Sequence, residues 1–152
     1  MINFFYKILI FITISVLFFS HSFSKENKIL FKVDNEIITT IDIYNEIKYL
    51  ETINDKQFQS LEQNKLIEIA KNSLIREKIK EIELLKRIGS LEIDQNILNK
   101  IILNYFKKNN IETITDFEEF FKNINIKPNV IRKKISVEIL WNQLIYKIFN
   151  KN

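Results

Sequence analysis

Two pairs of carboxylates are the side chains whose type and spacing could support catalysis in this chain. Glu77 and Glu81 are four residues apart, so a helix would place both on one face, and Glu118 and Glu119 are adjacent. Two acids held close together can share a proton or bind a metal ion. Lysines flank both pairs, however, and acidic side chains are rarely buried unless they are paired. We therefore interpret both pairs as solvated helix surface.

The rest of the composition excludes most enzyme chemistry. The chain has no cysteine, one glycine, one proline and a single histidine, His21. Beyond the first 24 residues there is thus no Ser-His or Cys-His nucleophile and no zinc site built from cysteine or histidine. A single glycine cannot form a glycine-rich phosphate loop. The sequence predicts a protein that is not an enzyme and that uses no cofactor or metal.

The first 24 residues have the layout of a secretory signal peptide. They carry one charge, Lys7, then an apolar run at residues 8–19, then Ser22-Phe23-Ser24, which predicts cleavage before Lys25. The alternative is an uncleaved membrane anchor, but the apolar run is shorter than the roughly 20 residues that a membrane-spanning helix needs. We expect an exported protein that meets the membrane only through this segment, and the mass of its mature form would show whether cleavage occurs.

The charge distribution does not indicate nucleic-acid binding. The chain has 23 basic and 19 acidic residues, and removal of the signal peptide would reduce its net charge from +4 to +3. Nucleic-acid binders concentrate basic residues on one face. The cluster Arg132-Lys133-Lys134 is contiguous, so its side chains would point in different directions on a helix. We interpret it as solvated surface and expect no nucleic-acid partner.

A short β-hairpin is predicted just after the signal peptide. In the segment ILFKVDNEIITTIDI, residues 29–43, apolar and polar residues alternate up to Asp34-Asn35, a pair that tolerates the positive φ of a tight turn. Thr39 or Thr40 can cap the following helix, with Asp42 near its first N–H groups. Because an isolated two-stranded hairpin is marginal in water, this one must pack against another part of the chain.

Helical periodicity dominates the remaining sequence. Apolar residues at spacings of three and four predict helices at about 41–53, 61–88, 94–108 and 128–149, with a short helix after a capping box at Thr115-Asp116-Phe117-Glu118. A second capping box, Ser60-Leu61-Glu62-Gln63, would open the long helix and Gly89 would end it. A broad apolar arc on this long helix predicts that several neighbours cover it.

The predicted fold class is therefore mainly all-α. We expect residues 25–152 to form a single helical domain of about five helices with a small N-terminal β-hairpin, preceded by the signal peptide at residues 1–24. The near-absence of glycine and proline argues against a sheet protein with many turns.

The last helix has apolar residues on two sides. One stripe consists of Val130, Val137, Trp141, Leu144, Ile145 and Ile148, and a second, roughly opposite, of Ile135, Ile139 and Tyr146. One stripe can serve the domain core. The other could be covered by another part of the chain, by a second copy or by an unfolded client, and the pattern leaves these alternatives open.

Three segments, in order, resemble the N-terminal domain of the SurA family of periplasmic chaperones. They are Val33-Asp34-Asn35-Glu36-Ile37-Ile38-Thr39; Leu74-Ile75-Arg76-Glu77 through Gly89 to Leu91-Glu92-Ile93-Asp94-Gln95; and Phe117-Glu118-Glu119-Phe120-Phe121 followed by Ile131-Arg132-Lys133-Lys134-Ile135. The resemblance covers about residues 29–149. It implies a periplasmic holdase that binds unfolded outer-membrane or other exported proteins without ATP.

The resemblance also sets the expected partners and site. We expect clients to contact apolar side chains of the last two helices: Ile135, Ile139, Trp141, Tyr146, Phe117, Phe120 and Phe121. The alternative is a structural or assembly module that forms a homodimer or completes a partner subunit. Peptidyl-prolyl isomerase activity is the least expected, because the family's parvulin domains have no counterpart here. The family's C-terminal helix also has none before Asn152, so residues 144–149 would fold back or a partner would cover the core.

Overall fold

The structure, a computed structural model, describes residues 27–53, 58 and 60–150. The predicted signal peptide, residues 1–24, lies outside the described residues. The described part is mainly helical, with one small antiparallel sheet, as predicted. Its elements are β1 (Ile29–Val33), β2 (Glu36–Thr39), α2 (Thr40–Ile53), α4 (Gln63–Ile88), α5 (Gln95–Tyr105), the short 3-10 helix η1 (Lys107–Asn109), α6 (Ile114–Asn123) and α7 (Pro128–Phe149). Among the described helices, none combines the length and hydropathy needed to cross a membrane.

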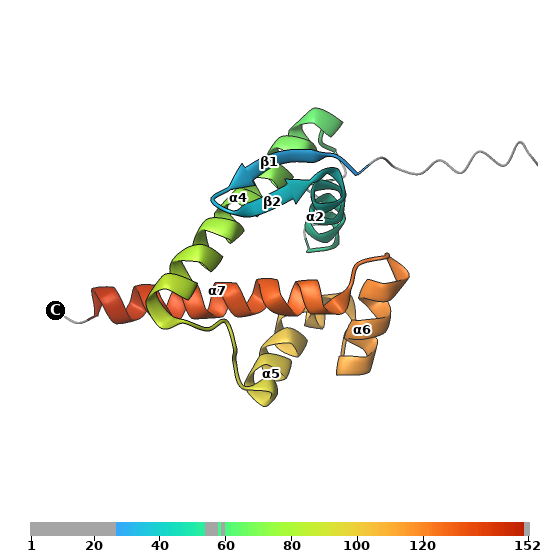
Figure 1. The fold of residues 1–152 in the computed structure, drawn as a ribbon. Helices are drawn as coiled ribbons and strands as arrows, with labels where there is room; N and C mark the ends of the chain where they lie inside the picture. The colour runs from blue at the N-terminus through green and yellow to red at the C-terminus, as the bar shows by residue number, and fades with distance from the viewer. Residues whose placement is uncertain (1–26, 54–57, 59, 151–152) are drawn as a thin grey trace, which may run out of the picture.

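The long helix α4 connects two packed regions. Figure 1 shows the hairpin and α2 beside the first part of α4, whereas α7 crosses the last part of α4 and has α5 and α6 on its other side. The smaller core contains Ile38, Ile43 and Ala70. The larger core contains Tyr49, Leu98, Ile102, Phe106, Ile111, Phe117, Phe121, Ile126, Ile131 and Ile135. Leu50 on α2 packs against both cores, so α2 joins them into one domain.

The hairpin packs on the helices as its sequence requires. Asp34 takes the positive φ of the turn, at 56°. The side chain of Ile38 is 1% exposed and packs with Ile43 and Ala70. Thr39 and Asp42 form reciprocal hydrogen bonds: the Thr39 N–H donates to Oδ2 of Asp42 at 2.8 Å, and the Asp42 N–H donates to Oγ1 of Thr39 at 3.3 Å. The turn from strand to helix is therefore fixed by its own side chains.

Three phenylalanines form the centre of the larger core. Phe106, Phe117 and Phe121 are 0% exposed, and their ring centroids lie 5.0–5.6 Å apart in edge and tilted arrangements. Helix α6 begins two residues earlier than predicted, because its capping box is formed by Thr113 and Asp116 rather than by Thr115 and Glu118. Phe117 and Phe121 are four residues apart and lie on the buried face of the helix.

Helix α4 differs from the prediction at its start and in its buried face. It begins at Gln63, two residues later than predicted, and its N-cap residue is Glu62 rather than the predicted Ser60. Glu62 makes no capping hydrogen bond through its side chain. The buried face is narrower than predicted, since Ile67, Leu85 and Ile88 are 39–46% exposed. The hairpin and α2 cover one end of α4, and α7 covers the other end. The described elements therefore leave part of the helix surface uncovered along its length.

Gly89 ends α4 as predicted, with a φ of 74° and its N–H donating to the Leu85 carbonyl. Nothing lies within 4 Å of the position that a Cβ would take, so a substitution changes only backbone strain. We expect Gly89→Ala to lower the free energy of unfolding by about 1 kcal/mol, and Gly89→Asn by less, because asparagine adopts left-handed geometry more readily. Urea unfolding measures both. Equal losses for the two variants would contradict this account.

Candidate functional site

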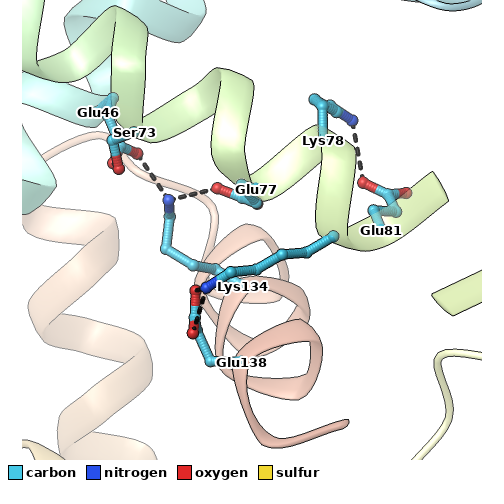
Figure 2. Close-up of polar contacts among 8 residues, drawn as sticks. Glu46, Ser73, Glu77, Lys78, Glu81, Lys134 and Glu138 are labelled. Atoms are coloured by element: carbon cyan, nitrogen blue, oxygen red, sulfur yellow. Dashed lines mark hydrogen bonds and ion pairs between the residues drawn. The ribbon is translucent and has the colours of Figure 1, made fainter. Parts of the chain in front are cut away.

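A buried ammonium group joins three helices near the centre of the molecule. Lys134 on α7 pairs with Glu46 on α2, at 2.9 Å between Nζ and Oε2, and with Glu77 on α4. Glu46 also accepts a hydrogen bond of 2.6 Å from Oγ of Ser73. Lys134 is 8% exposed and Glu46 3%. Figure 2 shows Lys134 between the two carboxylates. We refer to Glu46, Ser73, Glu77 and Lys134 as the Lys134 cluster.

Further ion pairs extend from this cluster along the crossing of α4 and α7. Glu81, which is 6% exposed, pairs with Lys78 at 3.2 Å and with Lys133. Lys78 also reaches Glu36 on β2 at 2.9 Å. Closer to the surface, Lys80 pairs with Glu138 at 2.6 Å. Charged contacts thus link the hairpin, α4 and α7. Figure 2 shows the pair of Lys78 with Glu81 on α4.

The interpretation of Glu77, Glu81 and Lys134 as solvated surface is wrong. On α4 the residues Ala70, Leu74, Glu77, Glu81 and Leu84 follow one another at intervals of four and three, so both carboxylates lie on the face that packs against the other helices. This is the same spacing that the apolar residues of the helix follow. A charged residue at such a position is the sequence signal that could have indicated burial.

The environment of the Lys134 cluster favours fixed protonation states. Burial alone would lower the pKa of Lys134, but the carboxylates of Glu77 and Glu46 outweigh it and raise this pKa above its ordinary value of 10.5. Burial raises the pKa of Tyr49, whose ring lies 5.1 Å from Nζ of Lys134, far above its ordinary value of 10.0, and the neighbouring Tyr105 adds to the rise. Lys134 therefore stays charged and Tyr49 stays neutral at physiological pH.

These protonation states make the cluster structural. A lysine held as ammonium is not a nucleophile, and both of its carboxylate partners are engaged with it. In the described part of the chain, no three carboxylate or histidine side chains are placed to hold a metal ion. The cluster adjoins a small cavity of about 90 Å³, lined by Asp42, Asn45, Tyr49 and other residues of the cluster's surroundings. Its geometry supports the joining of helices and not a reaction.

The residues predicted to contact clients do not lie on one surface. Phe117 and Phe121 are 0% exposed and Ile135 is 6% exposed, so all three belong to the larger core and cannot meet a client in this structure. Phe120 and Ile139 are half-buried and pack against that core. Trp141 is half-buried, and Tyr146 is 70% exposed. For Phe117, Phe121 and Ile135 the assignment is corrected from client contact to core packing.

An apolar groove lies elsewhere, between the hairpin, the start of α2 and the start of α4. Its volume is about 450 Å³, and its lining is mostly aliphatic and aromatic: Leu30, Thr40, Ile41, Ile43, Tyr44, Ile47, Gln63 and Ile67. We refer to it as the hairpin groove. Leu30, Ile41, Tyr44 and Ile67 are each 39–48% exposed in it. The Lys48 ammonium donates to the Ile124 carbonyl at 3.0 Å and lies 4.5 Å from the Tyr44 ring centroid.

The hairpin groove has no counterpart among the sites predicted from the sequence. Ile41 and Tyr44 come from α2, Leu30 from β1 and Ile67 from α4, so the surface exists only after these elements pack together. A local signal was present: Ile41 and Tyr44 are one turn apart on a side of α2 different from the buried Ile43 and Tyr49. Apolar residues outside the main stripe of a short helix indicate a second contact surface.

Removal of the Lys134 ammonium should be strongly destabilising, because it leaves two carboxylates near each other without their cation. We expect Lys134→Met to lower the free energy of unfolding by about 3–5 kcal/mol, and the additional changes Glu46→Gln and Glu77→Gln to restore part of it. Lys122→Met is the control, since Lys122 and its partner Glu118 have exposed side chains and should contribute less than about 1 kcal/mol. Urea unfolding compares the variants. Similar losses for Lys134→Met and Lys122→Met would contradict the assignment.

Stability should fall at alkaline pH. Tyr49 and Lys134 both have pKa values raised by folding, so the folded state keeps protons that the unfolded state loses above about pH 10. The free energy of unfolding should decrease by about 1.4 kcal/mol per pH unit for each such group. Tyr49→Phe should reduce this slope, whereas Tyr146→Phe, at an exposed position, should not. Urea titrations from about pH 9 to 11 measure it. An unchanged slope in Tyr49→Phe would refute the effect.

Comparison with known proteins adds no assignment to this geometry. No model of a protein family, no curated protein and no solved structure matches the chain.

Proposed function

We propose that this protein is an ATP-independent holdase for unfolded exported proteins and that the hairpin groove is its client site. The observation that carries the proposal is the groove itself: about 450 Å³ in volume, lined mostly by apolar side chains, with Leu30, Ile41, Tyr44 and Ile67 open to solvent. An accessible apolar concavity of this kind is typical of binding sites for apolar groups. Because none of the described residues that line it is charged, it selects for apolar character rather than for sequence.

Binding would be weak and reversible, as a chaperone without an energy source requires. A client segment that buried a few hundred Å² of apolar surface would gain several kcal/mol at ~25 cal/mol per Å². Ordering a flexible client costs much of this gain, so release needs no further step. The groove's walls come from α2, α4 and the hairpin, which the smaller core and the Thr39–Asp42 cap hold in place. The protein would thus pay little ordering cost of its own.

The location of this activity rests on the sequence. The signal-peptide pattern in residues 1–24 supports export, and the resemblance to the SurA family supports the periplasm and outer-membrane proteins as clients. The groove supports the same function independently, because it needs no resemblance to be identified. Clients are then expected to be unfolded chains rich in aliphatic and aromatic residues.

Aggregation assays test the proposal. Residues 25–152, which include every described element, should suppress light scattering when an unfolded β-barrel membrane protein is diluted from urea. The double variant Tyr44→Ser/Ile67→Ser should lose at least about half of this suppression because it removes apolar surface from the groove. The matched control Ile79→Ser/Ile97→Ser removes apolar side chains that are 51–53% exposed and do not line the groove, and should keep the activity.

Two results would reject the proposal. One is no suppression by the wild-type chain at several-fold excess over client. The other is an equal loss of aggregation suppression in the two double variants, which would show that the groove is not the client site. Sedimentation equilibrium distinguishes the alternative of a structural module: a stable dimer that Tyr44→Ser/Ile67→Ser dissociates would mean that a second copy fills the groove.

A further inference from the structure

The last turns of α7 and the end of α4 form a second groove. Gly89 turns the chain away after Ile88, whereas α7 continues to Phe149, and Figure 1 shows the C-terminal end of α7 extending past α4. The groove has a volume of about 460 Å³ and is lined by Arg87, Ile88, Leu140, Gln143, Leu144, Lys147 and Ile148. We refer to it as the α4–α7 groove. Ile67 and Ile88 lie 21 residues apart on α4, so it is roughly 30 Å from the hairpin groove.

The α4–α7 groove has an apolar floor of helical periodicity. Leu140, Leu144 and Ile148 follow at intervals of four on α7 and therefore form one continuous stripe. Ile88 contributes from α4 and is 46% exposed, and Ile148 is 44% exposed. A stripe about two turns long matches the anchor spacing of an amphipathic helix bound in a groove.

The rim of the groove is basic. Arg87 lines it from α4 and Lys147 from α7, and Lys86 is exposed in the last turn of α4. The Arg87 side chain is 54% exposed and donates through Nε to Glu83. Among the described residues, no acidic group pairs with Lys147. The groove therefore combines apolar contacts with two cations, of which Arg87 is paired with Glu83 and Lys147 has no acidic partner among the described residues.

We propose that the α4–α7 groove binds an amphipathic acidic segment of another protein. The apolar side chains of that segment pack against Leu140, Leu144 and Ile148. Its carboxylates pair with Arg87 and Lys147. The charge distribution selects this occupant over a second copy of the chain. In a symmetric dimer formed through the groove, each copy would present Arg87 and Lys147 to a surface that carries the same two cations and no acidic lining residue among those described. An acidic segment instead gains from both charges. The site is independent of the holdase activity proposed for the hairpin groove.

Two synthetic peptides test this site. Both carry the same leucine stripe at helical spacing, and one has glutamates and the other lysines at the flanking positions. By fluorescence anisotropy with residues 25–152, the glutamate peptide should bind at least about tenfold more tightly at low ionic strength, and this preference should shrink at about 0.5 M salt. The variant Arg87→Glu/Lys147→Glu should reverse the preference. Ile148→Ser should weaken both peptides and leave their ratio unchanged, because its contact is apolar.

The matched control is Lys32→Glu/Lys108→Glu. It makes the same change in net charge at exposed positions outside the groove and should keep the preference for the glutamate peptide. Circular dichroism verifies that each variant is folded. Equal binding of the two peptides to the wild-type chain, or a preference that survives Arg87→Glu/Lys147→Glu, would overturn the proposal. So would a dimer that Ile148→Ser dissociates, or binding to anionic lipid vesicles through Arg87 and Lys147 without binding of either peptide.

Discussion

The ammonium group of Lys134 and the carboxylates of Glu46 and Glu77 hold α7, α2 and α4 at one point. Burying three charges costs desolvation energy that their mutual attraction repays only when the geometry is good, so such a cluster adds less to stability than an apolar core of equal size. The cluster instead determines which arrangement of the three helices is stable. An apolar interface tolerates small shifts of one helix along another, whereas a buried charge without its partner is very costly. The crossing of α4 and α7, and hence the shape of the α4–α7 groove, depends on this constraint.

Local signals predicted most helix ends, because caps depend on neighbours in the sequence. Gly89, Asp94 and Pro128 end or begin helices where their conformational preferences place them. The start of α6 shows the limit of this reasoning. Both Thr113…Asp116 and Thr115…Glu118 fit a capping box, and the structure forms the first. A local pattern that two neighbouring positions satisfy does not by itself fix where the helix begins.

The charged interior and the grooves could not be derived in the same way. Glu77 and Glu81 occupy positions in the buried stripe of α4, but exposure is the usual state of a carboxylate, and their partners Lys134 and Lys133 come from a distant helix. Pairing across helices leaves no trace in a one-dimensional pattern. The same holds for the predicted client residues: the phenylalanines of α6 were correctly identified as apolar and clustered, yet they form the core, whereas Tyr44 and Ile67 meet solvent.

The position of the Lys134 cluster also bears on the order of folding during synthesis or transport, when the N-terminal end of a chain appears first. Glu46 and Tyr49 lie on the buried face of α2, and although Ser73 of α4 donates to Glu46, two further partners of that face, Lys134 and Ile131, are on the last helix. The early part of the chain therefore cannot complete its packing until α7 has arrived. Vectorial emergence would leave this face of α2 open, whereas the hairpin can already pack with Ile43 and Ala70. The larger core, to which Tyr49 belongs, would then be completed only in a late step.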